Sequence, residues 1–274
     1  MATPIGNLRD VSLRALDVLK AVDVVAAEDT RVTSRLLAHY AIGTKLMALH
    51  QHNERAGAER LIALLAAGKS VALVSDAGTP AVSDPGAKVV AMVRAAGHRV
   101  ESIPGASALL AALAASGIAD PHFLFYGFLP QQGAARCRAL EALQALPYTL
   151  AFYEAPHRVQ ASLTDMASVL GGARDVVIAR ELTKLFETIH VCKLGDAAAW
   201  LGEDGNRLKG EFVLLVSGAQ AGADAVLDEG RHVLEILLAE LPLKQAVKLA
   251  AEISGAKKNA LYEIALVLTG KNSG

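Results

Sequence analysis

The sequence predicts an α/β protein of two lobes followed by a small helical domain. Short β-branched runs alternate with longer segments of helical period over most of the chain, which is typical of helices packed on a sheet. β-forming signals nearly vanish after residue 217. With 274 residues, of which 53% are hydrophobic and 20% charged, the chain has enough apolar material for more than one core.

The expected strands are short apolar runs rich in β-branched residues. They cover 22–25, 71–74, 99–103, 149–153, 176–178 and 212–216. Leu, Val and Ala recur at helical intervals over 8–21, 31–40, 55–67, 84–96 and 107–116. These segments are expected to be helices that cover a sheet.

The domain boundaries follow from changes in composition. A shift near 117–121, followed by the aromatic stretch 123–130, indicates a boundary between an N-terminal lobe, 1–117, and a C-terminal lobe, 118–218. After a linker at 219–224, the chain is expected to form a small helical domain over 225–274. Its predicted helices are 231–241, 244–254 and 259–268.

Charge and hydropathy limit the function. A net charge of -1 and a pI near 6.7 argue against a surface that grips nucleic acid everywhere, so any RNA contact must be local. Apolar runs reach about half of the ~20 residues that cross a bilayer, and no leader is recognisable. Cys137 and Cys192 are expected to be buried free thiols. We therefore expect a soluble, cytoplasmic protein with no membrane partner.

Two loops of small residues follow expected strands. The loop 74–86 combines small, turn-forming and acidic residues, as ligand-binding loops of α/β sheets do. An ordinary connection with Ser83 or Asp84 as helix N-cap is the alternative. The segment 104–108 has a glycine that allows close approach of a ligand, and a plain strand-to-helix turn explains it equally well.

Charged groups gather after three other strands. The carboxylates of 27–31 could serve acid–base chemistry, or Asp29 or Thr30 could cap the next helix. The segments 153–158 and 179–184 offer acids and cations suited to hydroxyl and phosphate groups, with a solvated, ion-paired loop as the alternative. The histidines of 50–54 lack metal-ligand spacing, so no metal site is expected.

Together these motifs resemble one family in order along the chain. The matching segments are ATPIGNL at 2–8, 27–31, 52–54, 71–86, GFLP at 127–130, 153–158, 179–184, 209–211 and KKNALY at 257–262. They resemble the ribosomal RNA small subunit methyltransferase I family, which methylates a cytidine 2′-hydroxyl in 16S rRNA of the small ribosomal subunit. The resemblance implies the class III (tetrapyrrole methylase-like) methyltransferase fold, S-adenosylmethionine in the cleft between two α/β lobes, and a homodimer.

The resemblance implies which residues contact the cofactor, and the charged motifs supply the candidates for chemistry and RNA binding. The cofactor would contact Pro4, Ile5, Asp76, Gly78, Thr79, Ser107, Ala108, Phe152 and Tyr153. Glu181 and Lys184 are the candidates for activating the hydroxyl, because they lie in the densest charged motif, and Glu28 is the reserve. The candidates for RNA contacts are Arg31, Arg158 and Arg180 for the backbone, His52 and Asn53 for ribose or base edges, and Lys257 and Lys258 for flanking phosphates.

The sequence differs from the family pattern at two places, and two other functions are considered beside the main one. Family members usually carry an apolar strand directly before the segment 2–7, whereas Met1 abuts it here, so we expect either a truncated first strand or a start codon further upstream. Ala106 stands where relatives often have proline. A tetrapyrrole C-methyltransferase of cobalamin synthesis would share the fold but would not explain the helical tail. A non-catalytic RNA-binding ribosome-assembly module would bind RNA without the cofactor.

Overall fold

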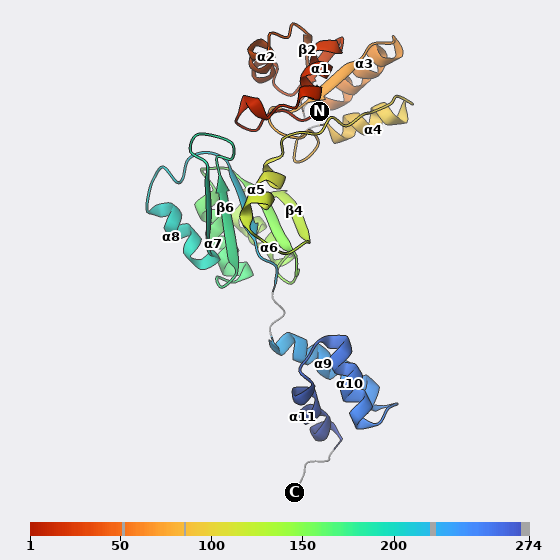
Figure 1. Cartoon of the computed structure of the whole chain (residues 1–274), viewed down its shortest axis with the longest axis vertical. Helices are drawn as coiled ribbons and strands as arrows, with labels where there is room; N and C mark the ends of the chain where they lie inside the picture. Colours follow the sequence, from red (N-terminus) through yellow and green to blue (C-terminus); the bar gives the residue numbers. More distant parts are fainter. Residues whose placement is uncertain (51–52, 85, 220–222, 270–274) are drawn as a thin grey trace. The chain divides into compact units, whose positions relative to one another are not determined.

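The computed structural model describes residues 1–50, 53–84, 86–219 and 223–269, and it divides into two compact units (Figure 1). The first unit, Met1–Gly218, contains two sheets with their helices. The second unit, Ala219–Gly274, is helical where it is described. This is the predicted class, an α/β protein with a helical C-terminal domain.

The first sheet is parallel and has three strands in the order β2-β1-β3. These are β1 (Val24–Ala27), β2 (Lys45–Ala48) and β3 (Val71–Val74). Helices cover both faces: α1 (Leu13–Ala21) and α2 (Thr30–His39) on one, and α3 (Glu54–Ala66) and α4 (Ala87–Ala95) on the other. Val25 and Ala27 of β1 pack on the first pair and Ala26 on the second, which is the alternation of a strand buried on both sides.

The predicted strand 99–103 is not a strand in the structure. The first residues of the chain lie beside this segment. They form one backbone hydrogen bond with it, from the Ala2 N–H to the Ile103 carbonyl at 3.1 Å. Thr3 forms an isolated bridge with Gly78. Because a β-ladder needs several consecutive bonds, this segment joins neither sheet.

The second sheet is mixed and has five strands in the order β4-β5-β8-β6-β7. They are β4 (Phe123–Phe128), β5 (Thr149–Glu154), β6 (Asp175–Arg180), β7 (Thr188–Lys193) and β8 (Phe212–Val216). β4 and β5 are parallel, whereas β5 with β8, β8 with β6 and β6 with β7 are antiparallel. All five residues of β8 are buried, so this strand forms the centre of the sheet.

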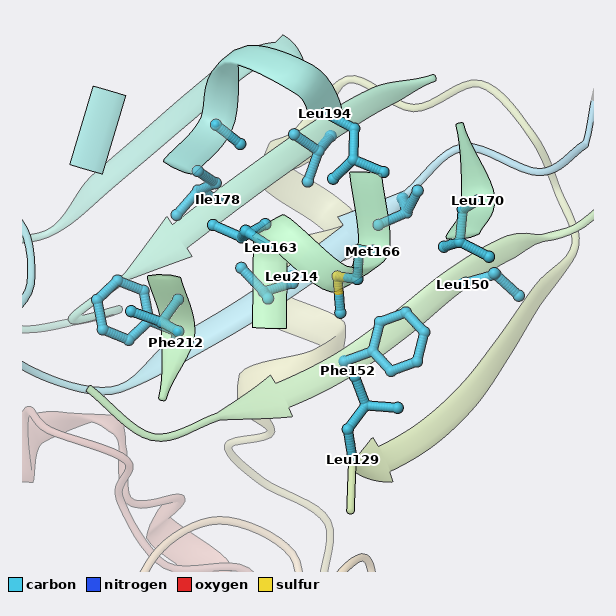
Figure 2. Packing of buried hydrophobic residues seen from close by; sticks show 14 of the residues in the cluster. Leu129, Leu150, Phe152, Leu163, Met166, Leu170, Ile178, Leu194, Phe212 and Leu214 are labelled. Carbon is cyan, nitrogen blue, oxygen red and sulfur yellow. The ribbon is translucent and has the colours of Figure 1, made fainter. Parts of the chain in front are cut away.

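Two apolar clusters sandwich this sheet. The larger one lies under α6 (Gly133–Glu141), α7 (Val159–Leu170) and α8 (Leu194–Gly202). Figure 2 shows Leu150, Phe152, Leu163, Met166 and Leu214 of this cluster packed together. The opposite face is covered by α5 (Ala108–Ser116), whose Leu109 and Ala112 contact the sheet.

Helix α5 precedes the predicted lobe boundary in the sequence but packs against the sheet of the second lobe. The predicted boundary at residue 117 assigns this segment to the first lobe, yet α5 packs against β6, β7 and β8 of the second sheet. The boundary between the lobes therefore remains a prediction. The position of α5 brings its N-terminus to the loops that follow the first sheet.

The C-terminal unit is a three-helix domain with its own core. Its helices are α9 (Ala223–Leu238), α10 (Leu243–Ser254) and α11 (Lys258–Leu268), so α9 begins inside the predicted linker. Leu234, Val247 and Leu261 are fully buried between them. Gly255, with φ of 74°, ends α10 in the left-handed region, where glycine is favoured. Lys257 and Lys258, which follow shortly after, are exposed at the start of α11.

The structure bears on two expectations from the sequence, which concern membrane-spanning helices and the two cysteines. Within the part of the chain that the structure describes, no helix is both long and apolar enough to cross a bilayer. Cys137 and Cys192 are free thiols, as expected, but both are only partly buried, whereas buried thiols were expected.

Candidate active site

A cavity of about 370 Å³ lies within the first unit, between the loops of the first lobe and the second sheet. This volume is in the usual range for small-molecule sites. Six of the nine residues predicted to contact a cofactor line it: Ile5, Gly78, Thr79, Ser107, Ala108 and Tyr153. Their contact with a cofactor remains a prediction, but the fold does bring them together.

Pro4, Asp76 and Phe152 are not among the lining residues. Phe152 is adjacent to Tyr153 in β5, and successive side chains of a strand point to opposite faces, so Phe152 is buried against the helices of the larger cluster (Figure 2). The Asp76 carboxylate accepts a hydrogen bond from the Asp29 N–H at 2.9 Å. Placing Phe152 on a cavity wall was therefore wrong.

Backbone contacts hold the first wall of the cavity. Gly78 exchanges two hydrogen bonds with Thr3, of 2.9 and 3.0 Å, and the Thr79 hydroxyl donates to the Ala106 carbonyl at 3.2 Å. Gly78 has φ of 74°, and a Cβ there would lie 3.3 Å from Cγ2 of Ile5. This position requires glycine for its backbone conformation and leaves little room for a side chain.

The second wall combines a helix N-terminus with aromatic rings. Ser107 is the N-cap of α5, and its hydroxyl accepts from the Leu110 N–H. The Leu109 N–H donates to the Tyr153 hydroxyl at 3.3 Å. Burial raises the pKa of Tyr153, so its phenol stays neutral, and its ring meets Phe128 edge to face with centroids 5.7 Å apart. A helix N-terminus facing a cavity favours an anionic group of a ligand.

The loop 77–86 meets the second sheet at a glycine. β4 has a bulge at Gly127, with φ of 83°, and a Cβ there would lie 2.7 Å from Oγ of Ser83. Ala81 and Ser83 also have positive φ values, 67° and 62°, which non-glycine residues rarely adopt. Such strain is held by surrounding contacts and is common at functional sites.

Neither Ser83 nor Asp84 caps α4, so the alternative that was considered for this loop, an ordinary helix cap at one of these residues, does not hold. The N-cap is Gly86, and its N–H donates to the Glu54 carboxylate at 2.9 Å. The strained turn carries Asp84 away from the helix end and onto the cavity wall. The carboxylate is therefore available for another role.

Three carboxylates of the first lobe, Glu28, Asp76 and Asp84, influence one another, and we call them the acidic cluster. Burial raises the pKa of Glu28, and the charges of Asp76 and Asp84 raise it further. Burial also raises the pKa of Asp84, and the charge of Asp76 raises it further, whereas a hydrogen bond from Ser75 lowers it. Like charges brought together in a partly buried place disfavour ionisation.

The neighbouring Asp29 has the structural role that was predicted as the alternative. It is the N-cap of α2, accepts from the Arg31 N–H at 2.8 Å and binds the Arg31 guanidinium at 2.6 Å. These hydrogen bonds lower the Asp29 pKa to about 2. The Arg31 side chain remains largely exposed, so the structure leaves it accessible at the surface.

On the second lobe, Glu181, Lys184 and Glu211 form a connected group that we call the Lys184 network. The Lys184 ammonium lies 2.8 Å from a carboxylate oxygen of Glu181 and 2.8 Å from one of Glu211. The Glu181 carboxylate also accepts from the Glu211 N–H at 3.0 Å. Glu211 lines the cavity, so the network borders the site from the second lobe.

The electrostatics of this network fix the charges of its members. Burial works to lower the Lys184 pKa, but hydrogen bonds to Glu181 and Glu211 outweigh it and raise the pKa. Burial works to raise the Glu181 pKa, but the Lys184 ammonium and the Glu211 N–H outweigh it and lower the pKa. Lys184 thus stays protonated and Glu181 ionised, so neither is a strong proton acceptor at neutral pH.

Two arginines expected at RNA hold the protein together instead. Arg158 pairs with the buried Glu154 at 3.2 Å and donates to the Leu129 carbonyl at 2.6 Å. Arg180, only 9% exposed, donates to the carbonyls of Lys209, Asn206 and Phe186. Guanidinium groups that are bonded to carbonyls in this way fix the loops that carry those carbonyls. Neither Arg158 nor Arg180 is therefore proposed as an RNA contact.

The segment around residue 53 also has a local role. The Asn53 side chain accepts from the His50 N–H at 2.8 Å and donates to the Ala48 carbonyl at 3.4 Å, so it orders the turn before α3. The predicted substrate residue His52 lies outside the described residues. Among the residues described, no cluster of His, Cys, Asp or Glu is arranged to hold a metal ion.

Sequence reasoning did not assign several residues of the cavity. Asp84 was named only as a possible helix cap in the alternative explanation, although its loop was singled out as a ligand-binding one. Phe128 and Glu211 lie in the GFLP and KGE segments that supported the family resemblance, so their motifs were the signal that could have found them. Val213 carried no signal beyond its place in an apolar strand.

The chain has the fold of the tetrapyrrole methylase class of methyltransferases. Residues 2–198 match the family of tetrapyrrole (corrin/porphyrin) methylases, and residues 224–269 match the family described as the RsmI C-terminal HTH domain. Along the whole chain the relatives are more specific, and the chain belongs to the ribosomal RNA small subunit methyltransferase I family.

Two curated relatives carry that family's name. The one from Pseudomonas aeruginosa is 52% identical over 274 residues, covering 99% of this chain and 97% of the relative. The one from Vibrio cholerae is 52% identical over 270 residues, covering 98% and 94%. These relatives and the matched C-terminal domain fit the rRNA methyltransferase interpretation and neither of the two alternatives.

Solved structures of other activities share the fold. Uroporphyrin-III-C-methyltransferase from Thermus thermophilus superposes with a TM-score of 0.57 at 22% identity, covering 79% of this chain and 91% of that one. Diphthine synthase gives a TM-score of 0.58 at 15% identity, covering 79% and 88%. At such identities the likeness concerns the fold alone.

Proposed function

We propose that this chain transfers a methyl group from S-adenosylmethionine to the 2′-hydroxyl of a cytidine in bacterial 16S rRNA. The observation that carries the proposal is the 52% identity to a curated ribosomal RNA small subunit methyltransferase I over almost the full length of both chains. The match includes the C-terminal helical domain, which a methylase of small molecules would not need.

The cavity suits the proposed cofactor. S-adenosylmethionine, when bound, supplies a methyl group on a positively charged sulfur. Ile5, Ala108 and Val213 offer apolar surface for its adenine and carbon chain. The N-terminus of α5 at Ser107 suits its carboxylate through the positive end of the helix dipole, although the N–H groups of Leu109 and Leu110 already donate to hydroxyls of the protein. Gly78 lets the backbone approach the ligand closely.

The Lys184 network is proposed to hold RNA at the edge of the cavity. Lys184 is a fixed cation, and Glu181 and Glu211 keep it in place. We propose that its ammonium attracts a phosphate or positions the ribose, while Glu181 orients it. This role replaces the expected activation of the hydroxyl by these two residues, because a paired, protonated amine cannot accept a proton.

The remaining RNA contacts are proposed at exposed cations of both units. Arg31 is exposed at the start of α2, and Lys257 and Lys258 are exposed at the start of α11. Acidic residues outnumber basic ones in the C-terminal unit, so its RNA contact would be local rather than spread over its surface. We also propose that the chain works as a cytoplasmic homodimer on the small ribosomal subunit.

Two measurements test the proposal. Ribosomal RNA from a strain lacking the gene, compared by mass spectrometry with RNA from the complemented strain, should lack one methyl group on a cytidine ribose of 16S rRNA. Calorimetry on the purified full chain should show binding of S-adenosylmethionine. Identical RNA masses in the two strains would contradict the substrate. RNA binding without cofactor binding would favour a non-catalytic assembly module.

A further inference from the structure

The loop between β6 and β7 carries two exposed apolar side chains beside the cavity. At its start, Leu182 is buried and lines the cavity. At its tip, Leu185 is 90% and Phe186 is 66% exposed. Leu185 is the most exposed large apolar side chain in the described part of the chain. Adjacent apolar side chains presented to water are typical of an interaction surface.

Hydrogen bonds within the loop fix the position of this tip. The Thr183 N–H donates to the Glu187 carboxylate, and the Glu187 N–H donates to the Lys184 carbonyl at 3.1 Å. The Thr188 hydroxyl donates to the Phe186 carbonyl at 3.3 Å. Thr183 has φ of 65°, which a non-glycine residue keeps only where surrounding contacts enforce it. The loop is therefore built to hold its apolar tip in solvent.

The Arg180 guanidinium joins this tip to the loop that precedes β8. It donates to the Phe186 carbonyl at 3.2 Å. On the second loop it donates to the carbonyls of Asn206 and Lys209, at 2.8 and 2.6 Å. Because one guanidinium binds all three carbonyls, the backbones of an exposed aromatic residue and an exposed lysine are held next to each other.

The same loop contacts the first wall of the cavity. The Asn7 N–H donates to the Thr183 hydroxyl at 3.1 Å. A Cβ at Gly6 would lie 2.5 Å from Cγ of Lys184, so the lysine stem packs against this segment. Ile5, the next residue back along the chain, lines the cavity. The loop tip thus stands beside the rim of the cavity, where an acceptor from solvent would enter.

The charges around the tip favour an anionic partner. The Lys209 ammonium donates to the neutral side chain of Asn206 at 3.0 Å, a partner that leaves its positive charge uncompensated. The neighbouring carboxylates each bind a protein group already: Glu187 the Thr183 N–H, Asp204 the Asn206 N–H, Glu203 the Arg207 guanidinium and Glu211 the Lys184 ammonium. An exposed aromatic ring beside a cation is the surface on which unpaired nucleic-acid bases stack.

We propose that Phe186 is a stacking platform for an unpaired base of the RNA substrate, with an adjoining phosphate at Lys209. A nucleotide whose ribose enters the cavity has to leave the RNA stack, and its base or the next one then lacks a stacking partner. The ring of Phe186 replaces that partner at the rim. This inference rests on the proposed function, because it assumes an RNA acceptor at this cavity.

Phe186→Leu tests the platform because it keeps an apolar side chain and removes the flat ring. Affinity for small subunits should fall about 10-fold or more, the value of one base–aromatic stack. Phe186→Trp should retain wild-type affinity. The single-turnover rate on saturating subunits should change less than about threefold, as for a contact equally strong before and during the reaction. Phe123→Leu, an exposed ring on the opposite edge strand, is the matched control.

Three further measurements separate RNA from other partners. Lys209→Gln should reduce the slope of log subunit affinity against log salt by about 1, the value of one phosphate contact. Lys193→Gln, at the far end of β7, is its control and should leave the slope unchanged. A short oligocytidylate should bind Phe186→Leu more weakly than wild type. Calorimetry with S-adenosylmethionine and the particle mass in light scattering should match wild type.

Several outcomes would overturn the platform. Wild-type subunit affinity in Phe186→Leu would show that no base stacks on this ring. A reduced particle mass in Phe186→Leu would assign the tip to a contact between two copies of the chain. Failure of the proposed function looks different: wild-type protein would bind subunits without methylating them, while a loss of binding in Phe186→Leu would still support the platform.

Discussion

The acidic cluster and the Lys184 network reach the same cavity, through Asp84 and Glu211 respectively, but their carboxylates have opposite electrostatics. Glu28 and Asp84 have raised pKa values because burial and like charges oppose ionisation. Glu181 has a lowered pKa because a lysine and a backbone N–H stabilise its charge. A carboxylate near a cavity is therefore no guide to its role until its partners are known.

Removing the cation should produce the largest change, because it makes the two clusters alike. Lys184→Met should slow methyl transfer about 10- to 100-fold, the value of a lost hydrogen bond to a charged group. Affinity for S-adenosylmethionine should stay within about threefold in calorimetry. Lys184→Arg should restore part of the rate. Wild-type single-turnover kinetics in Lys184→Met would show that the network has no part in the reaction.

A smaller effect, on the affinity for S-adenosylmethionine, is expected from a substitution at Gly78 in the first wall of the cavity. Gly78→Val would force a branched residue to φ of 74° beside Ile5. We expect affinity for S-adenosylmethionine to fall about tenfold or more, since a left-handed conformation alone costs an L-residue about 1–2 kcal/mol. Gly43→Val, with no atom within 4 Å of the added Cβ, is the control. Equal affinities of the two variants would exclude this loop from the cofactor site.

The pH dependence of stability should separate the clusters by sign. A raised folded pKa, as in Glu28, stabilises below the unfolded pKa and loses that contribution as pH rises through the folded value, so Glu28→Gln should be more stable than wild type near neutral pH. A lowered folded pKa, as in Glu181, stabilises above the unfolded pKa and is lost as pH falls, so Glu181→Gln should be less stable near neutral pH.

Urea unfolding at a series of pH values measures both effects. The difference in free energy of unfolding between each variant and wild type should change with pH, upward for Glu28→Gln and downward for Glu181→Gln as pH rises from the acid range. Parallel pH profiles for the two variants would mean that the two carboxylates do not differ in the way the structure indicates.

The smallest expected effect concerns the C-terminal unit. Lys257→Gln with Lys258→Gln should reduce the slope of log affinity for the subunit against log salt by roughly 1 to 2, the value for two phosphate contacts. Cofactor affinity should not change. Lys20→Gln with Lys45→Gln, both exposed in the first unit, is the control. Superimposable salt curves for all three proteins would assign the lysines of α11 another role, such as supporting a dimer.

Local sequence patterns predicted the elements that local forces determine. The strands 71–74 and 212–216 match β3 and β8 residue for residue, because apolar β-branched runs need a buried sheet. The predicted cap at Asp29 is confirmed for a similar reason, since its bond to the Arg31 N–H spans two residues. The strand 99–103 failed because a strand also needs a partner.

Patterns of charge predicted the place of the site better than the roles of its residues. The motifs after β3, β5 and β6 all reach the cavity, as the rule for strand ends anticipates. Yet Arg158 and Arg180 lie in those motifs as clamps on carbonyls, and Asp84 faces the cavity instead of capping α4. These assignments depend on contacts across 26 to 32 positions or between lobes, which no short pattern records.

The strand order of the second sheet has a consequence for biosynthesis. β8 is the last of its strands to leave the ribosome, yet it lies between β5 and β6 and joins the parallel pair β4–β5 to the hairpin β6–β7. Until residue 216 emerges, two incomplete sheets expose the apolar edges that β8 will fill. Phe212 and Val213 of β8 also line the cavity. The nascent chain is therefore expected to be vulnerable to aggregation late in its synthesis, and its ligand site closes in the same event that completes the sheet.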